Sequence, residues 1–131
     1  MKHILPLTYK PKIPDVRSGK CTQTIRPVSN VKPKQIGDWV MFHGWSGKPY
    51  CSKWNWRTPY WKIMYTLPIY FEEEDILFND ITDREFTLEQ CDEIAVLDGF
   101  EDFSHMLEEF LDMYGKKTYD ITFKIIRWNI N

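Results

Sequence analysis

The stretch Ser18-Gly19-Lys20-Cys21-Thr22-Gln23-Thr24-Ile25-Arg26 carries more information about this chain than any other. Its glycine permits backbone angles that bring amide groups close to a ligand. Lys20 and Arg26 attract anions, and Arg26 can hold a phosphate or carboxylate with two parallel hydrogen bonds. The threonines offer hydroxyls that can donate, accept or, when activated, attack. The stretch therefore predicts an anion-binding loop that leads into a strand. The alternative is an ordinary loop before a polar edge strand.

Length and composition favour one globular domain, which we expect to span residues 1–131. Hydrophobic residues make up 43% of the chain and aromatic residues 16%, which is sufficient for a buried core. No apolar run approaches the ~20 residues that a membrane-spanning helix needs. The first residues also lack the apolar stretch of a signal peptide. We therefore expect a soluble, cytoplasmic protein with no membrane partner.

The cysteines and histidines are too scattered to form a recognisable site. Cys21, Cys51 and Cys91 are an odd number at wide spacing, which is not a disulfide framework, and no CxxC pair suggests zinc. The three histidines are spread equally widely along the chain. The sequence therefore predicts no metal site and no cofactor.

Charge is distributed unevenly, although the net charge is only −2. Residues 1–35 carry eight Lys or Arg against one Asp, and residues 36–71 carry four against one. Residues 72–115 carry sixteen Asp or Glu against one Arg, and the last sixteen residues are basic again. Such polarity predicts a basic face that favours RNA or another polyanion. Two alternatives are that the halves neutralise each other by packing, or that the acidic helices bind a protein partner.

Apolar periodicity predicts strands first, then a helix pair, then a closing strand. A single helical turn is expected over residues 14–18, ended by Gly19. Thr87 begins a capping box that predicts one long helix, and Asp102 is the expected cap of another that ends at Gly115. This order predicts an α+β fold, a small and mostly antiparallel β-barrel with helices packed on one side. The expected strands cover residues 3–9, 22–26, 39–45, 60–71, 76–82 and 118–128.

Residues 45–61 mix aromatic and basic side chains. Exposed rings among Lys and Arg can stack bases while the cations hold phosphates, so Lys53, Trp54 and Arg57 are candidate nucleic-acid contacts. The alternative is a long hairpin whose tryptophans cover the barrel. Because tryptophan is highly buried on average, we expect two of the last three tryptophans of this interval in the core and one exposed.

The pattern Gly19-x-Cys21-x-x-Thr24-x-Arg26 resembles the GxKxxTxR signature of the activating-signal-cointegrator homology (ASCH) domain, a family of the PUA-like superfamily of small β-barrels. Further stretches fit the family in the same order, so the resemblance spans nearly the whole chain. These stretches are Lys10-Pro11-Lys12, Ile36-Gly37-Asp38-Trp39-Val40, Ala95-Val96-Leu97-Asp98-Gly99-Phe100 and the terminal Ile126-Arg127-Trp128.

The resemblance implies a cleft in which the signature faces the acidic segment that contains Asp98. PUA-like domains commonly bind RNA or modified bases, so the implied function is binding of RNA or a modified nucleoside. Lys20, Thr24, Arg26 and Asp98 are expected to line the cleft, and Lys10 is a further expected nucleic-acid contact. One ASCH branch, the bacterial acetylcytidine amidohydrolases, removes the acetyl group from acetylated cytidine, and some ASCH proteins have been described as ribonucleases. Either activity is the alternative function.

In the amidohydrolase branch a lysine activates a threonine nucleophile, and an acidic residue completes the set. Thr24 matches the threonine, and Asp98 matches the acidic residue, shortened by one methylene where the branch has glutamate. Cys21 stands at the lysine position. A thiol cannot supply the positive charge, because it is either neutral or, when ionised, negative, and its reference pKa of ~8.5 leaves it mostly neutral at pH 7. The adjacent Lys20 points the opposite way if the segment is extended. The sequence therefore favours binding over catalysis.

Each candidate catalytic residue also has a purely structural interpretation. Cys21 is either a nucleophile activated by nearby cations or a small residue that fills a semi-buried position. Asp98 is either a carboxylate of the cleft or a turn residue before the second helix. Thr24 is a ligand-contacting hydroxyl if no base lies beside it.

Overall fold

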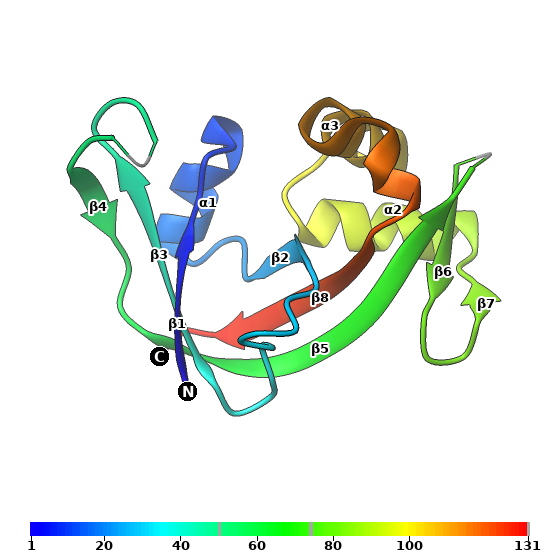
Figure 1. Ribbon diagram of the computed structural model, residues 1–131, viewed down its shortest axis with the longest axis horizontal. Helices are drawn as coiled ribbons and strands as arrows, with labels where there is room; N and C mark the ends of the chain where they lie inside the picture. Colours follow the sequence, from blue (N-terminus) through cyan, green and yellow to red (C-terminus); the bar gives the residue numbers. More distant parts are fainter. Residues whose placement is uncertain (50, 74, 131) are drawn as a thin grey trace.

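The computed structural model describes residues 1–49, 51–73 and 75–130 (Figure 1). Within these ranges eight strands form one mostly antiparallel sheet, and helices lie beside it, so the predicted α+β class is confirmed. The strands are β1 (Lys2–Pro6), β2 (Gln23–Pro27), β3 (Trp39–Trp45), β4 (Trp54–Arg57), β5 (Trp61–Glu72), β6 (Ile76–Asn79), β7 (Arg84–Glu85) and β8 (Thr122–Asn129).

The long antiparallel pair of β5 and β8 forms the centre of the sheet. β8 pairs on its other side with β2, and β5 pairs with β3 near its start and with β6 at its end. β3 also pairs with β4 and, in parallel, with β1. Among the described residues β1 and β2 have one strand partner each, so the sheet is open between them. The closed barrel expected from the sequence is therefore not confirmed.

The first segment is shorter as a strand than the sequence predicts. β1 ends at Pro6, and the chain then turns into a 3-10 helix, η1 (Lys10–Lys12), and the helix α1 (Ile13–Ser18). A proline lies in the first turn of each of these helices and favours helix initiation there, because the N–H group that proline lacks has no hydrogen-bond partner within a helix at that position. Gly19 ends α1 with a left-handed φ of +83°, as predicted.

Two other strand boundaries also differ from the prediction. β6 stops at Asn79, because the Asn79 side-chain oxygen accepts hydrogen bonds from the backbone N–H groups of Ile81 and Thr82 and so holds a turn. β8 begins at Thr122, because the residues before it form a 3-10 helix, η2 (Gly115–Tyr119).

The long helices α2 (Leu88–Leu97) and α3 (Phe103–Tyr114) lie together on one side of the sheet (Figure 1). The predicted capping box is present at α2, where Thr87 and Gln90 each accept a hydrogen bond from the other's backbone N–H. Asp102 caps α3 by accepting from the His105 backbone N–H at 2.8 Å. No helix within the described residues is long and apolar enough to cross a membrane.

Two apolar clusters form the core. One fills the space between the sheet and the helices α2 and α3, and the other lies between β1, β3, β8 and α1. β5 contributes to both, because a register shift after Ile63 moves its later residues to the other cluster. Trp61 is buried and Trp56 half-buried, whereas Trp54 is 44% exposed. Two of these three tryptophans were expected in the core and one exposed, and the structure differs only in that Trp56 is partly exposed.

Candidate functional site

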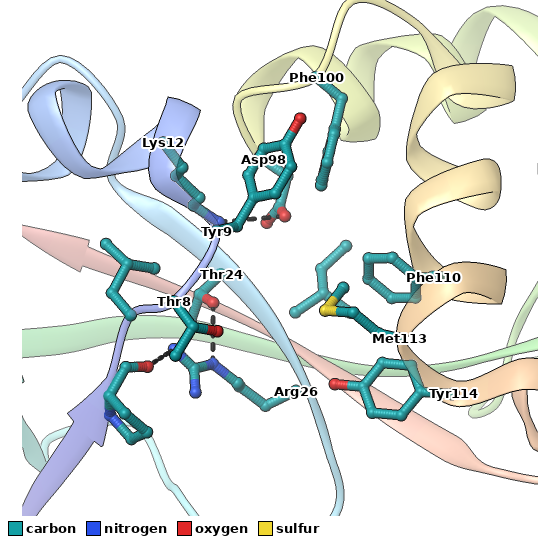
Figure 2. A pocket seen from close by; sticks show the side chains of 13 residues that line it. Thr8, Tyr9, Lys12, Thr24, Arg26, Asp98, Phe100, Phe110, Met113 and Tyr114 are labelled. Atoms are coloured by element: carbon teal, nitrogen blue, oxygen red, sulfur yellow. Dashed lines mark hydrogen bonds and ion pairs between the residues drawn. The ribbon is translucent and has the colours of Figure 1, made fainter. Parts of the chain in front are cut away.

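A cavity of about 100 Å³ lies where β2, the segment after β1 and helix α3 meet (Figure 2). It brings together Thr24, Arg26 and Asp98, three residues that the sequence assigned to one cleft. Aromatic rings form much of the remaining wall. They come from Tyr9, Phe100, Phe110 and Tyr114.

A buried ion pair lies in the wall of this cavity. Lys12 Nζ is 3.1 Å from Asp98 Oδ2, and the side chains are only 4% and 3% exposed. Asp98 is the C-cap of α2, and Gly99, with φ of +93°, then turns the chain away from the helix. Burial raises the pKa of the Asp98 carboxyl, and the charge of Lys12 and a hydrogen bond from Gln23 oppose part of this rise.

Gln23 fixes the orientation of the Asp98 carboxylate. Its Nε2 donates to Asp98 Oδ1 at 3.1 Å and to the backbone oxygen of Ile94 at 3.0 Å. Its Oε1 accepts from Arg127 Nε at 2.8 Å, so both ends of the amide are hydrogen-bonded. A continuous polar chain therefore runs from Lys12 through Asp98 and Gln23 to Arg127. Such satisfied networks hold their members in one geometry.

Arg26 joins the two open edges of the sheet. Its Nη2 donates to the Pro6 backbone oxygen on β1 at 2.6 Å, and its Nε donates to Thr24 Oγ1 at 3.1 Å (Figure 2). A nucleophilic threonine needs a neighbouring group that takes its proton. Arginine stays protonated in proteins, so the observed partner cannot do this. The geometry therefore suits Thr24 as a ligand contact.

The Cys21 thiol is part of the packing and does not line the cavity. It is 6% exposed, and Sγ contacts the backbone oxygens of Gln23 and Leu97 at 3.5 and 3.4 Å. Burial raises the pKa of the thiol, although the charge of Lys12 lowers it in part. A thiol kept neutral by burial is a poor nucleophile. The cation beside Asp98 thus comes from Lys12 and not from position 21.

The remaining predicted contacts lie outside this cavity. Lys20 is exposed beside Cys21, and Lys10 is exposed at the start of η1. Lys53, Trp54 and Arg57 are exposed on or next to β4. Within the predicted aromatic and basic interval, Tyr50 lies outside the described residues.

Positive charge gathers beside the cavity, next to Arg26. Arg26 lies directly opposite Lys124 in the β2–β8 register, and Lys124 Nζ donates to the Lys34 backbone oxygen at 3.0 Å. Burial and these two cations lower the pKa of Lys34. Within the described residues no carboxylate pairs with Lys34 or Lys124. Like charges placed together in this way destabilise a sheet unless an anion is near.

Sequence reasoning missed four residues that shape the site. Lys12 and Gln23 belong to stretches that the sequence had singled out, but their roles depend on partners about seventy or more positions away. Tyr9 and Tyr114 supply aromatic walls. The Tyr9 ring lies 5.3 Å from that of Phe100. The available signal for Gln23 was its place two residues from both Cys21 and Ile25, which are buried apolar residues. Nothing local marks the tyrosines.

Comparisons with protein-family models, curated proteins and solved structures find no match for this chain.

Proposed function

We propose that this protein is an RNA- or nucleotide-binding domain of the ASCH type, built as an incomplete PUA-like barrel, and that the cavity beside Arg26 receives a nucleobase. The observation that carries the proposal is a fixed carboxylate–ammonium pair between aromatic walls, with cations gathered at one side. The ordered motifs that resemble the ASCH family support the same function.

The chemistry of the wall suits the edge and face of a base. Lys12 has N–H donors beyond the one directed at Asp98, and a carboxylate has more lone pairs than Lys12 and Gln23 occupy. Lys12 can therefore donate to a base carbonyl while Asp98 accepts from a base amino group. Tyr9 and Tyr114 offer faces for stacking. A small cavity of this kind leaves the sugar and phosphate outside, beside Arg26, Lys34 and Lys124.

Fluorescence anisotropy with a labelled single-stranded RNA octamer, over a range of salt concentrations, tests this function. We expect affinity to fall as salt rises. Lys124→Ala should weaken binding and reduce the salt slope by about 1. Lys62→Ala is the control, because Lys62 is an exposed lysine of β5 that lines no described cavity. If neither the octamer nor any nucleoside 5′-monophosphate binds at low salt, the proposal fails.

An amidohydrolase is the second candidate, because Lys12 supplies beside Asp98 the positive charge that Cys21 does not. The test is turnover of N4-acetylcytidine, with an RNA digest run in parallel for ribonuclease activity. We expect Thr24→Ala and Asp98→Asn to abolish any turnover, and Lys62→Ala, an exposed change on β5, to leave it unchanged. If the folded protein turns over neither substrate, hydrolysis is rejected and binding alone remains.

A further inference from the structure

A second groove lies between the β3–β4 hairpin and the segment that forms η1 and α1. Its volume is about 240 Å³, larger than that of the cavity beside Arg26. Two tryptophans of the hairpin face it, together with side chains from the opposite segment. Its wall includes Leu7, Thr8, Lys10, Ile13, Trp45 and Trp56.

The fold holds both tryptophan rings in place. Trp56 lies against Gly44, its cross-strand partner, so closely that a Cβ at Gly44 would be 2.8 Å from Trp56 Cε2. The Arg17 guanidinium lies 5.3 Å from the centre of the same ring. Trp45 meets the His43 ring edge-on at 4.7 Å. Each indole is half-buried, so it is oriented by the protein and still accessible to a ligand.

The charge around the groove complements a polyanion. Lys10 and Arg17 are exposed on one side. On the other side, residues 46–57 contain Lys48, Lys53 and Arg57 and no Asp or Glu. Oriented aromatic rings among cations are the features with which proteins bind single-stranded nucleic acid, since the rings stack on bases and the cations contact phosphates.

The groove and the cavity beside Arg26 are neighbours, because Leu7 and Thr8 line both. We propose, building on the proposed function, that the groove binds the next nucleotide of the same single-stranded RNA. The base of that nucleotide stacks on Trp45 or Trp56, and its phosphate lies near Lys10. The protein then binds at least two adjacent nucleotides, one in the cavity beside Arg26 and one in the groove, with Thr8 between them.

The test compares a labelled RNA octamer with the four nucleoside 5′-monophosphates, which are too short to fill both sites. We expect Trp45→Ala to lower octamer affinity about ten-fold or more, as loss of a base-stacking ring does. Monophosphate affinity should not change. Lys10→Ala, a surface change with little risk to folding, should also weaken octamer binding. Thermal melting of each variant checks that it is folded.

Trp54→Ala is the matched control, because the structure places this candidate contact outside both the groove and the cavity beside Arg26. Trp54 belongs to the same hairpin but stacks on His43, with ring centres 4.0 Å apart, and does not line the groove. We expect this variant to bind the octamer as tightly as the wild type. If Trp45→Ala and Lys10→Ala both bind the octamer normally, or if Trp54→Ala alone weakens binding, the groove is not the second site although the proposed function stands. If the wild type binds neither probe, both proposals fall.

Discussion

Lys12 and Asp98 are 86 positions apart in the sequence, and their side chains form an ion pair of 3.1 Å inside the protein. Lys12 is the last residue of η1, and Asp98 is the C-cap of α2. The pair therefore fastens the first segment of the chain to the helices. Because both side chains are almost fully buried, water can replace neither partner, and each charge depends on the other.

The stability of the fold should depend strongly on this pair. Lys12→Met keeps most of the side-chain length but leaves the Asp98 carboxylate buried without its counter-ion. We expect the free energy of unfolding to fall by about 3–5 kcal/mol, which is typical when one partner of a buried pair is removed. Urea denaturation at pH 7 measures this change.

Lys10→Met is the matched control, because Lys10 is exposed two positions earlier and has no ion pair in the described structure. Its effect should stay within about 0.5 kcal/mol. The double variant Lys12→Met/Asp98→Asn should recover part of the lost stability, since it removes the unpaired charge. A double variant less stable than Lys12→Met would show that loss of packing, and not an isolated charge, is the cause.

Asp38 makes stability depend on acid pH. The His3 imidazole Nε2 lies 2.8 Å from Asp38 Oδ2, and the Gln35 backbone N–H also donates to this carboxylate. These interactions, the His3 hydrogen bond above all, lower the pKa of Asp38. A lowered folded-state pKa means that the ionised carboxylate stabilises the fold above the ordinary carboxyl pKa of about 4. That contribution is lost as the pH falls through the lowered value.

We therefore expect Asp38→Asn to be less stable than the wild type at pH 7, and the difference to shrink as the pH approaches 2. Urea denaturation at several pH values between 7 and 2 measures both. Asp112→Asn, an exposed change on α3, is the control and should differ little from the wild type at any pH. A difference for Asp38→Asn that stays constant down to pH 2 would contradict the explanation.

The three cysteines should react at very different rates. Cys51 is exposed, whereas Cys21 and Cys91 are buried, and burial raises the pKa of both buried thiols, that of Cys91 to about 11. Since the thiolate is the reactive form, iodoacetamide at pH 8 should label Cys51 first and the others only after denaturation. Peptide mass spectrometry identifies the sites. Rapid labelling of Cys21 in the folded protein would contradict the conclusion that this thiol is a poor nucleophile.

Local patterns in the sequence predicted those features that depend on near neighbours. The capping box at Thr87 and Gln90 needs only four consecutive residues, and the turn at Gly19 needs one residue that tolerates a positive φ. Thr24, Arg26 and Asp98 line one cavity, whereas Lys20, which was expected beside them, lies outside it. The cleft itself was not predictable from periodicity, because it is built from segments far apart in the chain.

The features that were missed depend on long-range packing. Lys12 carries the same charge as Lys10, and only the turn into η1 and α1 decides which of them is buried. The burial of Gln23 is favourable because α2 presents the Ile94 carbonyl to its amide. The parallel pairing of β1 with β3 likewise joins strands that no hairpin connects. The sheet is open between β1 and β2, where a closed barrel was expected.

Gln23→Glu should destabilise the protein in a pH-dependent way. The change keeps the shape of the side chain but replaces the donor that lies 3.1 Å from Asp98 Oδ1 with an acceptor. Two buried carboxyl groups in contact cannot both ionise without a large penalty, so the pKa of the pair rises in the folded state. A folded-state pKa raised above the unfolded value gives stability at low pH that is lost as the pH rises.

We therefore expect Gln23→Glu to be clearly less stable than the wild type at pH 7 and closer to it near pH 4, as measured by urea denaturation. Gln90→Glu is the matched control, because glutamate serves the capping box as well as glutamine does. It should change stability little at either pH. Equal stability of Gln23→Glu and the wild type at pH 7 would mean that Asp98 is already protonated in the fold, and Asp98 would then contribute no charge to the wall of the cavity.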